Sequence, residues 1–181
     1  MNLLSNNKAI TDLVNRLEIH IRDVQRLGEF YIADDIDLSR VVFPFVHWLL
    51  TDEQGVRQYA GPAVLCSMDN IARLYARLAA GKKIAPWEWE IELQAAKVAT
   101  QTVPEDMEAA CEAAVAAEAA AEPEGVYAWM VAFSAAEAHA CVVDDGQEET
   151  QVAVGETFRH ARNRIAVKFL ELVKAEAKAI T

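Results

Sequence analysis

The sequence predicts an all-α fold: a single domain over residues 1–181, built as a bundle of about seven helices around an alanine-rich central hairpin. Apolar residues recur at helical spacing in almost every segment, which is the main sequence signal of amphipathic helices. The chain has only 5 prolines and 7 glycines, as in helical proteins with short connections. Alanine, the best helix former, dominates its middle. With 53% hydrophobic residues, the chain can bury a sizeable core and is not wholly disordered.

The first two helices are expected in the N-terminal part of the chain. Ser5 or Asn6 can cap a helix that Gly28 ends. Acidic residues at 34–37 offer caps for a second helix, which is apolar on all sides and extends to Leu50. Pro44 lies inside this second helix and predicts a kink or two shorter helices. A helix this apolar should lie centrally in the fold, and we expect the last helix to be central as well.

Proline and glycine also delimit the third and fourth helices. The third is expected over residues 63–80, and Gly81 ends it. The fourth begins at Pro86 and opens with residues 87–93, in which apolar and acidic residues strictly alternate. This alternation alone predicts a strand. Proline at the first helical position and acids in the first turn predict a helix, which is our expectation.

The fifth and sixth helices form the predicted hairpin. Pro104 and the following acids start the fifth, which should end near Glu122. The sixth spans about residues 126–143, and the alanine-rich parts of the two helices can touch because their side chains are small. The last helix is expected over about residues 148–179, with a basic outer side and with Gly155 as a point of interruption.

The charge of the chain is concentrated in one stretch. Residues 98–158 contain thirteen acidic residues and neither lysine nor arginine, although the net charge of the whole chain is only −11. Acidic runs are usually solvated helix faces that favour solubility. However, like charges four residues apart, such as Glu108 and Glu112, cost a few tenths of a kcal/mol each in a helix. That the sequence keeps such repulsive pairs indicates a function for the negative field, such as the attraction of a basic partner.

No residue set typical of catalysis or of cofactor binding stands out. Helical metal centres pair Glu-x-x-His motifs with further carboxylates, and none of the four histidines has a glutamate three residues earlier. The chain contains no glycine-rich phosphate loop, no Cys-x-x-Cys and no nucleophile elbow. We therefore expect neither an enzyme nor a bound metal or cofactor.

The cysteines and the apolar runs bear on the cellular location. Cys66, Cys111 and Cys141 are odd in number, lie in apolar contexts and have no paired spacing. We interpret them as reduced core residues of a cytoplasmic protein. No apolar run approaches the roughly 18 residues of a membrane-spanning helix, and the first eight residues lack the pattern of a secretory signal.

Part of the chain resembles a known family. Residues 69–77, Asp-Asn-Ile-Ala-Arg-Leu-Tyr-Ala-Arg, lead into Gly81-Lys82, and alanine-rich helices with the segment Ala-Ala-Glu-Ala-His-Ala at 135–140 follow. These features are similar to the alanine-rich, all-helical immunity proteins of bacterial polymorphic toxin systems. The likeness covers about the central half of the chain, and Ser67-Met68 stands where the family has a motif rich in proline and arginine. The resemblance implies a cytoplasmic protein that neutralises a toxin by tight binding.

We predict a small acidic inhibitor that binds a basic protein partner: a toxin, a nuclease or a nucleic-acid-binding defence complex. It would act as an immunity protein or as a phage-type inhibitor of bacterial defence such as an anti-CRISPR protein, with nucleic-acid mimicry as one mode. Direct binding to nucleic acid or membrane is not expected, and the oligomeric state is open. The predicted partner-binding residues are Glu105, Glu108, Glu112, Glu118, Glu122, Glu124, Asp144, Asp145, Glu148 and Glu149.

Two other interpretations of the sequence stay open. The chain could be a helical enzyme or small-ligand-binding protein with an aromatic pocket between helices, lined by Trp48, Tyr75, Trp87 and Trp89. Alternatively, it could be a structural subunit of a larger assembly.

Overall fold

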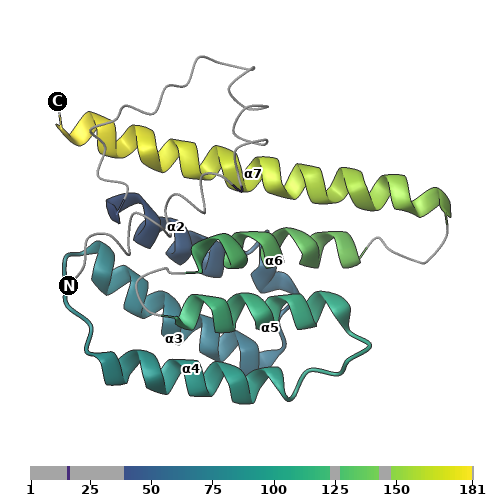
Figure 1. The fold of residues 1–181 in the computed structure, drawn as a ribbon, viewed down its shortest axis with the longest axis horizontal. Coiled ribbons are helices and arrows are strands. Elements are labelled where there is room, and N and C mark those ends of the chain that lie inside the picture. Colours follow the sequence, from purple (N-terminus) through teal and green to yellow (C-terminus); the bar gives the residue numbers. More distant parts are fainter. Residues whose placement is uncertain (1–15, 17–38, 123–126, 143–147, 181) are drawn as a thin grey trace.

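The computed structural model describes residue 16 and residues 39–122, 127–142 and 148–180. Within these ranges all regular structure is helical and no strand occurs, which confirms the all-α prediction (Figure 1). The elements are α2 (Ser39–Thr51), the short 3₁₀ helix η1 (Val56–Tyr59), α3 (Pro62–Ala79), α4 (Pro86–Thr100), α5 (Glu108–Ala121), α6 (Ala128–Cys141) and α7 (Glu148–Ile180). Of the predicted first helix, which ends at Gly28, only Arg16 is described, and it is helical. The count of about seven helices and the single-domain organisation therefore stay predictions.

Helices α2 and α3 pack against each other and supply most of the large side chains of the core, to which α7 adds Phe169 and Leu170. Phe45 on α2 and Tyr75 on α3 are completely buried. Pro44 lies within one continuous helix and does not split it. Its missing N–H removes a single bond in the second turn, and burial of the apolar side chains around it offsets this cost. Gly81 follows α3 with a φ of 73°, a left-handed conformation that glycine adopts without steric cost.

The alanine-rich hairpin of α5 and α6 lies at the centre of the described part of the chain. Ala113, Ala116, Ala120, Ala136 and Ala138 are completely buried. Small side chains let the two backbones approach closely, as the sequence predicted. Besides α6, helix α5 packs against α3, α4 and η1.

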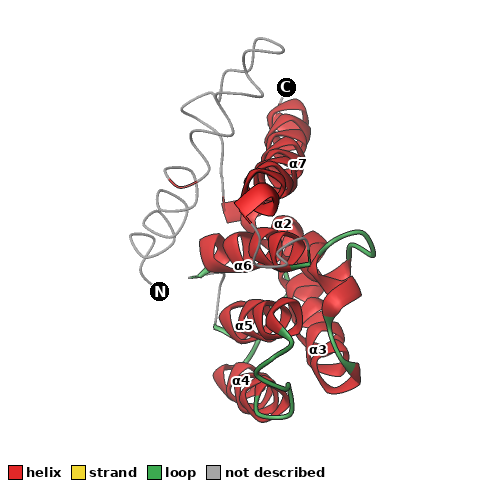
Figure 2. Cartoon of the chain, turned by 90° about the vertical axis from the view of Figure 1, so that its right-hand side faces the viewer, coloured by secondary structure: helices red, strands yellow, loops and turns green. Residues whose placement is uncertain are grey.

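The last helix is not central among the described residues. Helix α7 lies along an outer side of the layered helices, over α2 and α6 (Figure 2). The expectation that it would be central is therefore wrong for this part of the chain. The acidic helix α5 occupies that place instead because alanine, unlike a larger residue, permits neighbours on several sides.

Helix boundaries follow local hydrogen bonding. The alternating segment 87–93 is helical, as predicted, and Glu88 caps α4 because its Oε1 accepts the backbone N–H of Ala85 at 3.0 Å. Helix α5 begins at Glu108 and not at Glu105, because Met107 N–H donates to the carbonyl of Pro104 in a turn. Gly155 does not interrupt α7. A helix of 33 residues tolerates one exposed glycine, because the missing side chain leaves no gap in the core.

The cysteines differ from expectation. Cys66 is exposed, and Cys111 and Cys141 are partly exposed, so the prediction that all three are core residues is wrong. Their sequence neighbours are apolar, but Cys66 faces outward and the other two lie at the border of the core. All three are free thiols. Over the described residues, no helix combines the length and apolar character needed to cross a membrane.

Candidate partner-binding face

Four of the predicted acids lie along a side of α5 that no described element covers. The remaining sides are buried against α3, α4 and α6. We call this side the acidic stripe; its members are Glu108, Glu112, Val115, Glu118 and Glu122. Their spacing of three or four residues places them on one helix face. Glu108 and Val115 are exposed, and the other three are half-buried. Alanine at the positions between them therefore leaves acids as the main chemistry that α5 presents to solvent.

A further glutamate from the neighbouring helix strengthens this field. Glu137 on α6 is half-buried, and burial raises the pKa of its carboxyl, with the charge of Glu112 as the next cause. Arg162 on α7 acts in the opposite direction and lowers this pKa. The negative field also reaches Cys141. The pKa of its thiol is raised first by burial and then by Glu108, Glu112 and Glu137. Glu112 thus acts on Glu137, and all three carboxylates, from two helices, act on this thiol.

The N-terminal end of the stripe borders an open hollow of about 700 Å³. We call it the acidic hollow; its lining residues are Gln58, Tyr59, Asp106, Met107, Glu108, Ala109, Ala110 and Cys141. The Met107 side chain is 54% exposed and so presents apolar surface to solvent at this site. The hollow therefore combines two carboxylates with an apolar surface from Met107 and two alanines. This is the chemistry that suits a lysine or arginine, whose stem is apolar and whose head is cationic.

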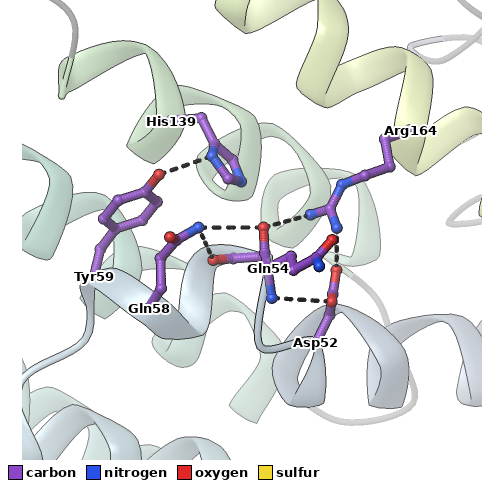
Figure 3. Close-up of polar contacts among 7 residues, drawn as sticks. Asp52, Gln54, Gln58, Tyr59, His139 and Arg164 are labelled. Atoms are coloured by element: carbon purple, nitrogen blue, oxygen red, sulfur yellow. Dashed lines mark hydrogen bonds and ion pairs between the residues drawn. The ribbon is translucent and has the colours of Figure 1, made fainter.

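A polar network holds the wall of the hollow in place (Figure 3). Arg164 on α7 donates to Oδ2 of Asp52 at 2.6 Å and to the carbonyl of Gln54 at 2.9 Å. The side chain of Gln58 in turn donates to the carbonyls of Gln54 and Gly55, at 3.2 and 3.1 Å. These bonds join the segment before η1 to α7. They connect Gln58, which lines the hollow, to the same carbonyl of Gln54 that Arg164 binds.

Tyr59 is held by a separate contact in the same region (Figure 3). Its hydroxyl lies 2.8 Å from Nδ1 of His139, and the two rings meet edge to face. Burial lowers the pKa of His139, and the nearby charge of Arg164 lowers it further, against an opposing effect of Asp52. Burial raises the pKa of Tyr59, against an opposing effect of Arg164. Both groups are therefore neutral near pH 7, and the charge at the hollow comes from its carboxylates.

The ten sequence-predicted residues are only partly brought together. Glu105 is exposed in the turn before α5, close in sequence to the acidic hollow. Glu124, Asp144 and Asp145 lie outside the described residues. Glu148 and Glu149 belong to the first turn of α7, but the positions of their side chains are outside the described part. The predicted contribution of these last five residues stays a prediction.

Several residues of this face were not among the predicted ones, among them Asp106, Met107, Tyr59 and Glu137. Asp106 and Glu137 belong to the same acidic stretch and could have been chosen from their charge. Met107 could have been singled out as a large apolar residue within an acidic turn. Tyr59 comes from η1, about fifty residues away in sequence. No sequence pattern indicates that η1 packs against α5 and α6, so that residue was not accessible to sequence reasoning.

The aromatic residues of the alternative interpretation do not line one pocket. Tyr75 and Trp89 are buried against each other with ring centroids 5.3 Å apart. Trp48 stacks on Phe45 and lies beneath Arg164 of α7. Trp87 is 62% exposed on the outside of α4. In the part of the chain that the structure describes, no group of three or more histidine, cysteine and acidic residues is placed to hold a metal ion.

Comparisons with family models, with curated proteins and with solved structures gave no match to this chain. The geometry and charge of the face described above are therefore what indicates its function.

Proposed function

We propose that this protein is a stoichiometric inhibitor that binds a basic surface of a partner protein through the acidic stripe and the acidic hollow. The observation that carries the proposal is the joint placement of Glu108, Glu112 and Glu137, whose carboxylates share one field on two adjacent helices. Arg162 is the base that opposes Glu137. Such a one-sided field attracts basic surfaces and repels acidic ones.

The mode of contact follows from the chemistry of the hollow. A lysine or arginine of the partner would place its stem against Met107 and its charged head between Asp106 and Glu108, both of which line the hollow. Exposed Val115 gives the stripe an apolar contact between its glutamates. Affinity would come mainly from these apolar contacts, because hot spots of binding are desolvated anchors. The surrounding acids would accelerate encounter.

The class of partner is a nuclease, a toxin or a nucleic-acid-binding defence complex, because such proteins carry basic surfaces that bind phosphates. A row of carboxylates along one helix face would occupy such a surface as a nucleic-acid backbone does. In this proposal the protein acts in the cytoplasm as a toxin immunity protein or as a phage-type inhibitor of bacterial defence. The family resemblance of residues 69–77 and 135–140 supports the first of these two roles.

The proposal is tested by affinity capture from host extract, with two matched triple variants. The first carries Glu108→Lys, Glu112→Lys and Glu118→Lys on the acidic stripe. The second carries Glu53→Lys, Glu156→Lys and Glu171→Lys, which are exposed acids on other elements and give the same change in net charge. We expect wild type and the second variant to recover the same basic protein, and the stripe variant to lose it. Recovery of that protein by all three, with circular dichroism unchanged, would exclude the acidic stripe as the binding surface.

A further inference from the structure

Helix α4 carries an apolar stripe on its outer side that no described element covers. Trp87, Ile91 and Val98 are 62%, 55% and 61% exposed. They lie on one face because they are four and seven residues apart. The opposite side of the helix, with Trp89, Ala96 and Ala99, is buried against the rest of the fold. In both ribbon views α4 lies at the edge of the layered helices farthest from α7 (Figures 1 and 2).

The spacing of this stripe is that of a short coiled-coil seam. Positions 87, 91, 94 and 98 alternate steps of four and three residues, as the a and d positions of a heptad do. Gln94, which is exposed, completes the series. A single polar residue at such a position is a known device for fixing the register of paired helices. The stripe therefore has the pattern that pairs with another helix.

The flanking charges indicate which helix that is. Glu90 and Lys97 are both exposed and lie on the same flank of the stripe, seven residues and so two turns apart. When two copies of α4 pair in antiparallel orientation, equal flanks meet, and Glu90 of each copy faces Lys97 of the other. The same register sets Trp87 against Val98 of the second copy and Ile91 against Gln94. Parallel pairing would oppose Glu90 to Ala95 and gain no ion pair.

The opposite flank does not compete for these groups. There Glu88 is already bound to Arg77 of α3, with the second contact of this ion pair at 3.3 Å. Hydrogen bonding to Arg77 lowers the pKa of Glu88, so this carboxylate stays ionised and paired. Arg77 and Glu88, with Asn70 and Arg73, form the rim between α3 and α4. Charge complementarity for a second copy thus lies on the flank that carries Glu90 and Lys97.

We propose that the protein forms a two-fold symmetric homodimer through antiparallel pairing of α4 with α4 of a second copy. The apolar residues of one four-turn helix bury less than the roughly 800 Å² per partner of a standard interface. The dimer is therefore weak, and it dissociates on dilution. None of its residues belongs to the acidic stripe or the acidic hollow. The proposal is thus independent of the proposed inhibitor function.

The test is sedimentation equilibrium of the full chain from about 1 μM to about 1 mM, at low salt. Wild type should pass from monomer to dimer within this range. Glu90→Lys and Lys97→Glu, each alone, turn two attractive contacts into repulsive ones and should raise the dissociation constant about tenfold. An equimolar mixture of these two variants should form a heterodimer as tightly as wild type forms its homodimer. The double variant should restore the homodimer.

Glu53→Lys serves as the control for charge, because it changes an exposed acid away from α4, and it should leave the dissociation constant unchanged. Ile91→Glu places a charge within the seam and should abolish the dimer while circular dichroism stays unchanged. A wild type that remains monomeric up to the highest concentration would overturn the proposal. So would a dimer whose dissociation constant the two charge reversals do not change, or a mixture that associates no better than either variant alone.

Discussion

The hydroxyl of Tyr75 ties α3 to the end of the acidic helix, and its removal gives a sharp test of this architecture. Tyr75 is completely buried, and its hydroxyl donates to the carbonyl of Ala120 at 2.9 Å, with the carbonyl of Glu122 at 3.3 Å. The last carbonyls of a helix lack partners within the helix. Water cannot readily replace the hydroxyl at a buried site, so we expect Tyr75→Phe to cost the desolvation of an unsatisfied group, about 2 kcal/mol.

The ring itself should stay in place in this variant, since its contacts with Trp89 and Phe43 do not involve the hydroxyl. For a chain of this size, about 2 kcal/mol corresponds to a fall in Tm of about 4 to 8 °C. Urea denaturation and thermal melting followed by circular dichroism would measure both quantities. Tyr127→Phe, at an exposed tyrosine, is the matched control and should change the free energy of unfolding by less than about 0.5 kcal/mol. Equal effects of the two substitutions would refute the role of Tyr75 at the end of α5.

Three further predictions concern packing and pH. Ala136→Leu, at a completely buried position of the hairpin, should lower the free energy of unfolding by about 1–3 kcal/mol through overpacking. Urea denaturation would measure this change. Ala76→Leu, at an exposed position of α3, is the control and should be nearly neutral in the same assay. Because the pKa of Glu137 is raised above its ordinary 4.5, the folded state holds that proton more tightly and stability is lost as pH rises through the raised pKa. Glu137→Gln should therefore increase the free energy of unfolding, relative to wild type, more at pH 7.5 than at pH 4; an equal change at both would contradict it. The pKa of His139 is lowered below 6.5, so the unfolded chain binds that proton first and the free energy of unfolding falls as pH drops below 6.5. His139→Gln should therefore flatten this part of the plot of stability against pH. An unchanged slope would show that the imidazole is not shielded.

Sequence reasoning predicted the all-α class and most of the helix positions because periodicity and capping are local properties. The segment 87–93 shows how this works: its alternation is typical of a strand, but Pro86 at the first helical position and the cap formed by Glu88 decide for a helix. Alanine also predicted the packing of α5 against α6, since small side chains let two helix backbones approach each other.

The positions of the helices relative to one another were harder to predict from the sequence. Alanine-rich sequence does not reveal how many neighbours a helix has, so the central position of α5 was missed, and α7 was expected there. The stripe could be predicted from the spacing of Glu108, Glu112 and Glu118 alone. The hollow could not, because Tyr59 and Cys141 reach it through contacts between elements far apart in the chain. Apolar sequence neighbours likewise suggested buried cysteines, whereas Cys66 is exposed and Cys111 and Cys141 are only partly buried.

The central claim, that the acidic stripe binds a basic partner, is tested most directly by association kinetics with the captured protein. Rate constants would be measured for wild type and for the two triple charge-reversal variants at about 0.01, 0.15 and 1 M salt, at which charges are screened over about 30, 8 and 3 Å. We predict that the stripe variant associates at least tenfold more slowly than wild type at low salt. At 0.15 M salt the association rate of the control variant should stay much closer to that of wild type. At 1 M salt the difference between the stripe variant and wild type should vanish. Equal association rates of wild type and the stripe variant at every salt concentration, with both folded, would contradict the claim and leave the acids as a solvated face.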